Sequence, residues 1–404
     1  MAPEAQRDAA RTNCWCVPAV FSQSPILDIK ETGKTLGLRL QALHEQLLET
    51  VPELDRIACA LYDPSDDLLK TYVNSTRKGE PIQGYEFRLS ASRSLSQLAR
   101  SGERRVLDDI PAAIQASNQH SAWLLQQGYL SSLTVPLYDK GNFIGFLFFD
   151  SCQSAAFTPK VQRNLALFAS LMNMTISNEL HVVRSITSSA QVAREFANLR
   201  DFETGSHLER MAHYARLIAR QLQASHGLSD EYIEHLYLFA PLHDIGKIGI
   251  PDSVLLKPGR LTPDERALME THVEKGVAVL DRLIGEFGMQ DLPDSHVMRN
   301  VVAGHHECLD GSGYPLGLRG DAVALEARII AVADIFDALT SHRPYKEPWS
   351  IEAALEELHR LVAMGKIDAH CVAAMDGNRE ELASILECFR DVPLEPSAET
   401  TRQP

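Results

Sequence analysis

The chain has 404 residues, of which 45% are hydrophobic and 23% are charged. This composition excludes a disordered chain and predicts about two to three folded domains with full hydrophobic cores. The formal net charge is -15, so we expect no broad basic surface for binding a nucleic-acid polymer. An anionic substrate would need local positive charge, such as that of metal ions.

The seven cysteines contain no C-x-x-C pair, which favours reduced thiols over a disulfide framework. Cys14 and Cys16 flank Trp15 in a polar stretch, where they form either a weak redox or metal pair or simply part of a frayed terminus. No run approaches the roughly 18 apolar residues of a membrane span. We therefore expect a cytoplasmic protein without a membrane segment.

The first half of the chain mixes helical and strand patterns, which predicts an α+β domain. A helix is expected at residues 36–48, and apolar or alternating runs predict strands at residues 57–62, 71–73 and 130–137. The turn at residues 139–142 lies between the apolar runs 133–138 and 143–150, and together these segments predict a β-hairpin.

The end of this domain resembles a GAF domain. The resemblance rests on Ser132-Leu-Thr-Val-Pro-Leu, Gly141, Ile144-Gly145, Phe149-Asp150-Ser151 and Phe157-Thr158. It implies a small-molecule sensor or a dimerisation module. The asparagine-lysine and phenylalanine-aspartate pattern of cyclic-nucleotide-binding GAF domains is not found, so the ligand stays unnamed.

A long helix is expected to follow, with Thr158 as its N-cap and Pro159 at its first position. Apolar residues at spacings of three or four form one stripe along it, namely Leu165, Phe168, Met172, Ile176, Leu180, Val183 and Ile186. The stripe either pairs two subunits, which gives a homodimer through the GAF domain and this helix, or packs on the sheet of its own domain.

From residue 200 to about residue 390 the pattern is almost wholly helical, which predicts an all-α bundle. The capping box Thr262-Pro-Asp-Glu265 predicts the start of the helix that carries His272. All but three of the 15 histidines follow residue 200, so we expect the chemistry of the protein in this half.

Several residues in this half that can bind metals lie next to or within apolar segments. Glu203 and His207 lie four residues apart on one face of a predicted helix, although such a pair alone is more often a surface hydrogen bond. Three further places join ligand-type residues to an apolar run, namely His243-Asp244, His305-His306 and Asp334. Burying these side chains without a cation would be unfavourable.

With His272, these positions supply five histidines, three carboxylates and no cysteine. Nitrogen and oxygen ligands suit iron or manganese better than structural zinc. Eight ligands are too many for one ion, and two or three ions about 4 Å apart can activate water and bind a phosphate through its oxygens. The residues therefore predict metal-dependent hydrolysis of a phosphodiester.

The same region resembles the HD-GYP family much more specifically. The matching segments are RDFETGSH at 200–207, HDIGK at 243–247, HHE at 305–307, GYP at 313–315, ADIFDALTS at 333–341 and RPYK at 343–346. The resemblance implies a helical bundle of the HD superfamily that hydrolyses cyclic di-GMP, a bacterial second messenger, to pGpG or GMP.

The resemblance also implies roles for single residues. The implied metal ligands are Glu203, His207, His243, Asp244, His272, His305, His306 and Asp334. Asp244 would bridge two ions, and a carboxylate at Glu203 marks the family members in which a third ion is plausible.

Beyond the ligands, the resemblance implies that Lys247 binds phosphate as a point charge and that Arg343 and Lys346 hold the phosphates from the far side. Tyr314 would shape the pocket or touch the substrate. Asp337 either protonates the leaving oxygen or serves as a structural cap or salt bridge.

We predict a flexible segment at residues 1–30, a GAF domain at 31–180, a connecting signalling helix at 181–200, an HD-GYP domain at 201–393 and a disordered tail at 394–404. The leading hypothesis is a signalling enzyme in which the GAF domain acts on the metal site through the long helix.

Two rival hypotheses stay open. The first is a cyclic-dinucleotide receptor that acts through partners such as diguanylate cyclases, contacted by the GYP loop, although the intact ligands and Lys247 argue against it. The second is a phosphodiesterase for another cyclic dinucleotide, such as 3′,3′-cyclic GMP-AMP, because metals and phosphate clamps do not read the base.

Overall fold

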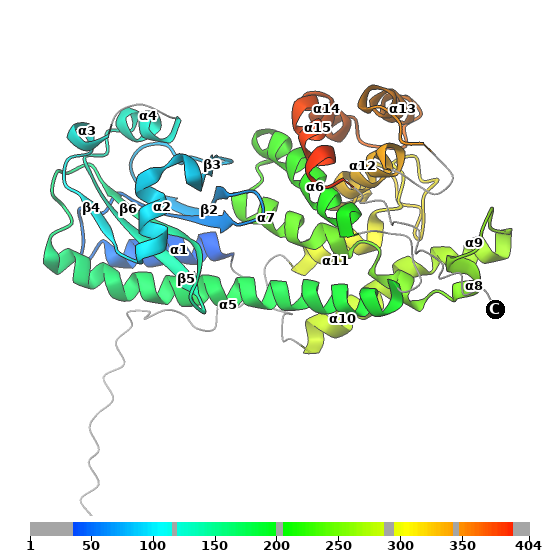
Figure 1. Cartoon of the computed structure of the whole chain (residues 1–404), viewed down its shortest axis with the longest axis horizontal. Helices are drawn as coiled ribbons and strands as arrows, with labels where there is room; N and C mark the ends of the chain where they lie inside the picture. Colours follow the sequence, from blue (N-terminus) through cyan, green and yellow to red (C-terminus); the bar gives the residue numbers. More distant parts are fainter. Residues whose placement is uncertain (1–34, 115–118, 199–204, 287–294, 342–346, 391–404) are drawn as a thin grey trace, which may run out of the picture.

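The computed structural model describes residues 35–114, 119–198, 205–286, 295–341 and 347–390. The predicted flexible segment at residues 1–30 and the predicted tail at 394–404 lie outside these residues. Figure 1 shows an N-terminal domain built on a β-sheet and a C-terminal helical domain, with one long helix running along both. No helix among the described residues is long and apolar enough to cross a membrane.

The N-terminal sheet has six strands in the order β3-β2-β1-β6-β5-β4, and every neighbouring pair is antiparallel. Its strands are β1 (Arg56–Asp63), β2 (Leu68–Thr76), β3 (Glu86–Arg88), β4 (Arg105–Leu107), β5 (Ser131–Asp139) and β6 (Asn142–Ser151). The predicted hairpin is confirmed as β5 and β6. Lys140 and Gly141 form its turn with φ angles of 47° and 85°, the backbone geometry that matches the twist of two paired strands.

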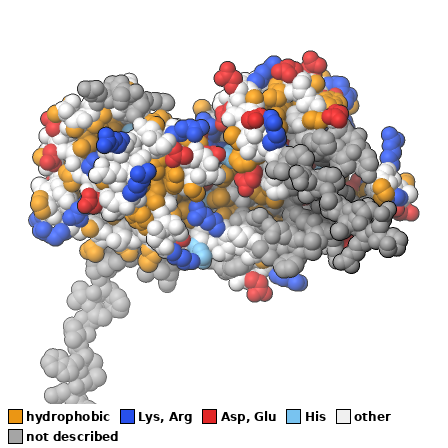
Figure 2. Space-filling view, viewed as in Figure 1, with side chains coloured by type: hydrophobic (Ala, Val, Ile, Leu, Met, Phe, Trp, Pro, Cys, Tyr) orange, Lys and Arg blue, Asp and Glu red, His pale blue; other side chains and the backbone are white. Residues whose placement is uncertain are grey.

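Helices cover both faces of this sheet (Figure 1). On one face lie α1 (Leu36–Leu47) and α5 (Pro159–Asn198), and on the other lie α2 (Arg93–Ser101), α3 (Ile110–Ala113) and α4 (Gln119–Gln126). Figure 2 shows basic and acidic side chains interspersed over one face of this domain.

The apolar stripe of α5 packs within its own chain. Its first five residues, Leu165 to Leu180, join the core of the N-terminal domain, whereas Val183 and Ile186 join the core of the helical domain. The stripe therefore packs on both domains of its own chain, and the homodimer stays a prediction. Because one rigid helix enters both cores, it ties the two domains together.

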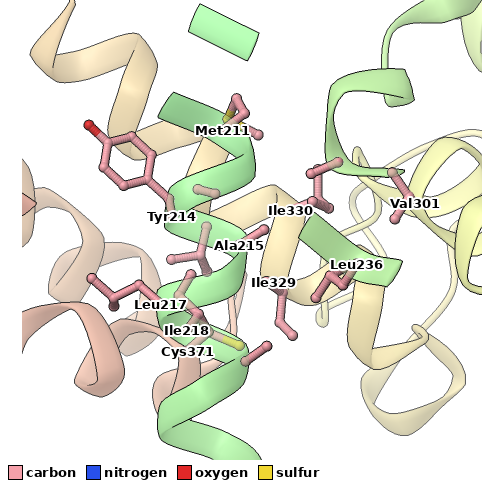
Figure 3. Packing of buried hydrophobic residues seen from close by; sticks show 14 of the residues in the cluster. Met211, Tyr214, Ala215, Leu217, Ile218, Leu236, Val301, Ile329, Ile330 and Cys371 are labelled. Carbon is pink, nitrogen blue, oxygen red and sulfur yellow. The ribbon is translucent and has the colours of Figure 1, made fainter. Parts of the chain in front are cut away.

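The C-terminal domain is helical, as predicted. It contains α6 (Gly205–His226), α7 (Asp230–Phe239), α8 (Asp252–Leu255), α9 (Pro263–Glu270), α10 (His272–Glu286), α11 (Ser295–Gly304), α12 (Leu325–Thr340), α13 (Ile351–Ala363), α14 (Ala369–Asp376) and α15 (Arg379–Cys388). Tyr214 and Ile218 of α6 meet Leu236 of α7 and Ile329 of α12 in its core (Figure 3), and all four side chains are fully buried. Burying one such side chain stabilises the fold by about 1.5–3 kcal/mol.

One predicted helix start is corrected by the structure. The capping box of Thr262 and Glu265 is present, but the helix that it begins, α9, ends at Glu270. Thr271 closes α9 with backbone bonds to Leu268 and Met269, and its hydroxyl donates to the Leu268 carbonyl at 2.6 Å. Because this tightened turn ends the helix, His272 is the first residue of a new helix, α10.

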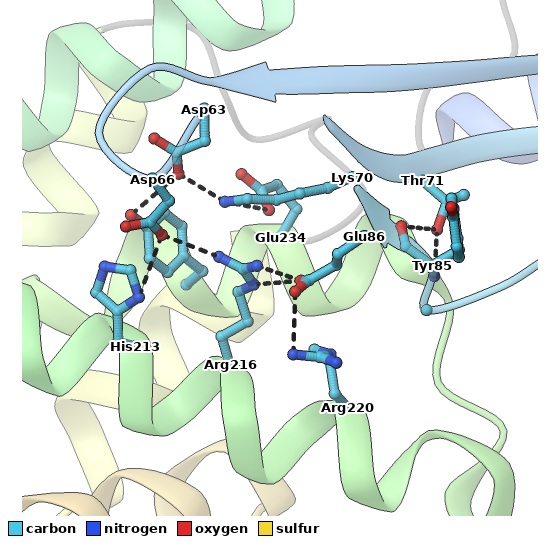
Figure 4. A network of polar contacts seen from close by, with 12 residues as sticks. Asp63, Asp66, Lys70, Thr71, Tyr85, Glu86, His213, Arg216, Arg220 and Glu234 are labelled. Atoms are coloured by element: carbon cyan, nitrogen blue, oxygen red, sulfur yellow. Dashed lines mark hydrogen bonds and ion pairs between the residues drawn. The ribbon is translucent and has the colours of Figure 1, made fainter. Parts of the chain in front are cut away.

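The two domains also contact each other directly, at the sheet edge formed by β2 and β3 (Figure 4). Glu86 of β3 binds Arg216 of α6 through the Arg216 Nε at 3.1 Å, and it binds Arg220 at 3.1 Å. Lys70 of β2 lies 2.6 Å from Asp63 of its own domain and 3.8 Å from Glu234 of α7. The long helix is therefore not the only connection between the domains.

A second direct contact caps a helix of one domain with a side chain of the other. Glu231 of α7 accepts hydrogen bonds from the backbone N–H groups of Leu36 and Gly37, at 2.7 and 3.0 Å. These donors belong to the first turn of α1, where the helix has no internal partner for them. The carboxylate thus completes α1 and fixes it against the helical domain.

The interdomain ion pairs predict an acid-sensitive stability. Burial alone would raise the pKa of Glu86, but Arg216 and Arg220 lower this pKa below its ordinary value of 4.5. A carboxyl group with a lowered pKa stabilises the folded state above its ordinary pKa, and this contribution is lost as the pH falls below it. Glu86→Gln should therefore lower the urea midpoint near pH 7, and the difference from the unsubstituted protein should shrink between about pH 5 and pH 3.

The matched control is Glu80→Gln, which changes an exposed glutamate just before β3. It should leave the urea midpoint unchanged at every pH. If the urea midpoints of the Glu86→Gln variant and the unsubstituted protein differ by the same amount at every pH, the ion pairs are not the source of the stability difference.

Candidate metal centre

Seven of the eight predicted metal ligands lie together in the C-terminal domain. They form two groups in which the candidate ligand atoms lie within 4.8 Å of one another, Asp244 with His272, His305 and His306, and His207 with His243 and Asp334. The eighth, Glu203, lies outside the described residues, as do the predicted phosphate-binding residues Arg343 and Lys346.

Asp244 stands between the two groups. Its Oδ1 lies 3.1 Å from the Nε2 of His272 and 3.6 Å from the Nε2 of His305. Its Oδ2 lies 3.3 Å from the Nε2 of His243 and 2.8 Å from the Nζ of Lys247. Burial would raise the pKa of Asp244, but Lys247 and His243 hold it well below its ordinary value. This carboxylate is therefore ionised at neutral pH and can serve both groups.

Backbone carbonyls orient three of the histidines in the same way. The Nδ1 atoms of His243, His272 and His305 lie 3.0, 2.8 and 3.0 Å from the carbonyl oxygens of Ala240, Met269 and Val302, each three residues earlier in the chain. A carbonyl only accepts, so each Nδ1 carries the proton and donates it. This tautomer leaves Nε2 as the lone-pair nitrogen, and hydrogen bonding of the other ring nitrogen is typical of metal-ligating histidines.

The ring nitrogens of this group fit a cation. The Nε2 atoms of His272 and His305 face each other at 3.5 Å, and with both Nδ1 atoms donating, two neutral rings direct their lone pairs at one place. Burial lowers the pKa of His305, so protonation of its ring is unfavourable and does not relieve the contact. A divalent ion between these atoms would relieve it, and their nitrogen and oxygen donors suit such an ion.

Asp337 of α12 orients the fourth histidine, His207. Its Oδ2 accepts from the Nδ1 of His207 at 2.8 Å, and Arg210 donates to both carboxylate oxygens at 2.6 and 3.0 Å. Ser341 adds a further hydrogen bond. Burial opposes ionisation, but His207 and Arg210 lower the pKa of Asp337 to about 2. The salt bridge left open for Asp337 is therefore present, and its role as a proton donor stays a prediction.

The sequence reasoning missed Arg210 and Ser341. Arg210 is one helical turn after His207, but nothing in its local pattern distinguishes it from a surface arginine. Its partner Asp337 lies 127 residues further along the chain, so only the packing of α6 on α12 brings the two together.

The loop that carries Tyr314 is held against the histidines. Tyr314 stacks on His306 with ring centroids 4.7 Å apart, and its backbone N–H donates to the His306 carbonyl. Glu307 accepts from the N–H groups of Leu316 and Leu318, at 2.7 and 2.9 Å. The glutamate of the His-His-Glu motif thus fixes the shape of the loop, and Tyr314 forms a wall of the cluster.

Gly246 allows the close approach that places His272 beside Asp244. A Cβ atom at this position would lie 1.8 Å from the His272 carbonyl oxygen and 2.4 Å from the backbone nitrogen of Gly276. Backbone atoms cannot yield as a flexible side chain can. Gly246→Ala should therefore push α10 away from Asp244 and lower metal content by more than half while leaving a helical fold. Metal analysis and circular dichroism would measure this. The control is Gly205→Ala, where a Cβ atom would meet no described side chain within 4 Å.

Asp337→Asn tests the positioning of His207. The amide oxygen of the new side chain can still accept a hydrogen bond from His207, but it lacks the negative charge that Arg210 binds. Loss of such a supporting carboxylate lowers metal affinity about 10- to 100-fold. Titration against a chelating dye would measure the affinity, and thermal unfolding would show that the variant is folded. An unchanged affinity in a folded variant would rule out a positioning role.

Comparison with known proteins matches residues 37–177 to the GAF domain family and residues 191–371 to an HD domain family. The chain is 46% identical over 198 residues to the cyclic di-GMP phosphodiesterase response regulator RpfG of Xanthomonas campestris, and the match covers 49% of each chain. It is 40% identical over 171 residues to a cyclic di-GMP phosphodiesterase of Thermotoga maritima, covering 42% of this chain and 44% of that one.

A third relative is named for a different substrate. The chain is 39% identical over 197 residues to the 3′3′-cGAMP-specific phosphodiesterase 2 of Vibrio cholerae, covering 48% of this chain and 36% of that one. The chain thus spans about half or less of the length of these three relatives. Both domain resemblances found in the sequence motifs are confirmed at the level of the domain family, and the chain contains a GAF domain at residues 37–177 followed by a mostly helical HD domain at residues 191–371.

Proposed function

We propose that this protein is a metal-dependent phosphodiesterase that hydrolyses cyclic di-GMP to pGpG or GMP. The observation that carries the proposal is the buried cluster around Asp244, in which histidine and aspartate ligand atoms converge in two adjoining groups. The two relatives named as cyclic di-GMP phosphodiesterases support the choice of substrate.

We propose two or three divalent ions, iron or manganese, as the cofactors. The ligands would be His207, His243, Asp244, His272, His305, His306 and Asp334, with Glu203 deciding between two ions and three. Their nitrogen and oxygen donors support iron or manganese over a structural zinc site. When bound, such ions would polarise the phosphate and lower the pKa of a water molecule.

Two residues at the edge of the cluster are suited to the substrate. The ammonium group of Lys247, whose side chain is 24% exposed, can donate to a phosphate oxygen while staying next to Asp244. Burial and the charge of Asp244 raise the pKa of Tyr314, so its hydroxyl keeps its proton at neutral pH and can donate as well. Arg343 and Lys346 are proposed to bind the phosphates from the opposite side.

We assign Asp337 to the positioning of His207 rather than to proton donation. A group with a pKa of about 2 is ionised at neutral pH and has no proton to give to a leaving oxygen. The leaving group would then take its proton from water or from another side chain.

To test the function, the protein is first reconstituted anaerobically with Fe(II) or Mn(II). It is then incubated with cyclic di-GMP, and the products pGpG and GMP are followed by chromatography. The proposal expects product with at least one metal and none after chelation. Binding of cyclic di-GMP without product under either metal would instead favour the receptor hypothesis, in which the protein acts through partners such as diguanylate cyclases.

A second substrate is favoured by a specific observation. Two relatives at 39% identity are named 3′3′-cGAMP-specific phosphodiesterases, and a metal cluster around Asp244 would bind phosphates, which both cyclic dinucleotides contain. The same assay with 3′,3′-cyclic GMP-AMP at equal concentration decides between the two cyclic dinucleotides by the ratio of kcat/KM values.

Asp244→Ala should abolish hydrolysis and lower metal content at the same time, because this carboxylate serves both groups. We expect a loss of more than about 1,000-fold in kcat, since removal of a central charged group affects every ion in the site. The assay is the chromatographic one, with metal content measured by mass spectrometry.

The control for this variant is Asp321→Ala, which removes a fully exposed carboxylate of the same domain. It should change neither hydrolysis nor metal content. An Asp244→Ala protein that retains both would refute the ligand assignment.

We also propose a homodimer formed through α5. The face of α5 opposite the buried stripe carries Leu167, Leu171 and Met174, which are 74%, 52% and 64% exposed. Their spacings of four and three residues match the repeat of apolar residues along the seam of a two-stranded coiled coil.

A further inference from the structure

A cavity of about 400 Å³ lies inside the GAF domain. It lies on the face of the sheet covered by α2, α3 and α4, and all six strands contribute to its lining. Its volume is within the range of small-molecule sites in proteins. The phosphodiesterase proposal assigns no role to this space.

Three buried nitrogen atoms on the lining have no hydrogen-bond partner in the described structure. They are the Nε of Arg56, the Nε of Arg105 and the Nδ1 of His120. Buried polar atoms without partners are rare in folded proteins, and each one calls for an explanation. The two arginine nitrogens can only donate, so a molecule that satisfies them must bring hydrogen-bond acceptors.

The charges on the lining are unbalanced. Arg56 is paired with the carboxylate of Asp150 at 2.5 Å. Arg105 donates to the hydroxyl oxygens of Ser94 and Thr134, at 2.6 and 3.3 Å, and among the described residues it has no ion pair within 4.0 Å. Burial lowers the pKa of Arg105, which reflects the unfavourable desolvation of this charge. One anionic group would balance it.

The lining also carries aromatic rings beside these charges. The rings of Tyr85 and His120 are stacked with centroids 5.7 Å apart, and His120 lies 6.1 Å from Phe148. Burial, with the charge of Arg56, lowers the pKa of His120 to about 4, so its ring is uncharged at neutral pH. Flat rings of this kind stack on a planar ligand.

We propose that this cavity binds a small planar aromatic molecule with one anionic group, and that Glu86 carries its occupancy to α6. Tyr85 and Phe87 both line the cavity, and Glu86 stands between them in the chain. Its side chain binds Arg216 and Arg220 of α6 (Figure 4). The same helix holds His207 and Arg210 at the candidate metal centre.

Ligand binding in the cavity does not depend on the proposed phosphodiesterase function. The regulatory role of Glu86 does rest on that proposed function. A ligand that fixes Tyr85 and Phe87 restrains β3, which restrains the arginines of α6 through Glu86. We therefore expect slower hydrogen exchange along α6 when the cavity is filled.

Calorimetric titration of the full chain tests binding, with 4-hydroxybenzoate, benzoate and phenyl phosphate as probes and phenol as the uncharged comparison. At least one anionic probe should bind more tightly than phenol. Arg105→Gln should weaken that probe about tenfold, because it removes a charge-assisted hydrogen bond, and should leave phenol unaffected. Arg104→Gln, at the exposed neighbouring position, should change neither.

Two outcomes would overturn the binding proposal. One is the absence of binding by all three anionic probes, and the other is equal affinity for the anionic probes and phenol. Carboxylate and phosphate probes together show which anionic group the cavity prefers.

Hydrogen–deuterium exchange with the tightest probe tests the coupling. Peptides from residues 205–226 should exchange more slowly in the liganded protein, and Glu86→Gln should remove this effect while keeping the probe's affinity within about twofold, because Glu86 does not line the cavity. Unchanged exchange of these peptides in the liganded, unsubstituted protein would overturn the coupling. Neither measurement needs turnover, so they remain informative if no cyclic dinucleotide is hydrolysed.

Discussion

The buried charge of Asp244 is the constraint on which the C-terminal domain depends. A carboxylate in this position is stable only if cations or hydrogen-bond donors surround it, and the domain brings three separate segments to it. His243 and Lys247 come from the turns after α7, His272 from the start of α10, and His305 from the end of α11. Each of these segments lies at or just beyond the end of a helix. The packing of the helices therefore sets the geometry of the site.

Helix α6 links this arrangement to the rest of the molecule. Its first turns hold His207 and Arg210 against Asp337, its middle is buried in the helical core, and Arg216 and Arg220 reach the sheet of the GAF domain. A helix is stiff over this length, so a displacement at one end is transmitted to the other rather than absorbed locally. A movement in one domain can therefore reach the other domain either through α5 or through α6.

Sequence reasoning predicted the features that depend on local pattern. The β5–β6 hairpin follows from two apolar runs around a turn, and the candidate ligands follow from polar residues that interrupt apolar helix ends. The break between α9 and α10 was missed because a good capping box fixes where a helix begins but not where it ends.

The polar contacts between distant segments could not be predicted in the same way. Arg210 and Asp337 are 127 residues apart, and Glu231 caps a helix 195 residues before it. Arg210 and Glu231 look like ordinary surface residues in their own segments, and the pattern around Asp337 does not indicate which residue it binds. The unpaired nitrogens of the GAF cavity likewise become visible only when strands and helices from the whole domain enclose one space.

The carbonyl contacts of His243, His272 and His305 have a consequence for how this site can change. Because main-chain oxygens orient these three imidazoles, no side-chain replacement elsewhere can remove the atoms that hold their rings in place. His207 is different, since its orientation depends on the side chains of Asp337 and Arg210. Among natural variants of this protein, substitutions that alter the metal site should therefore concentrate around His207. The ring orientations of His243, His272 and His305 should stay the same because the backbone sets them.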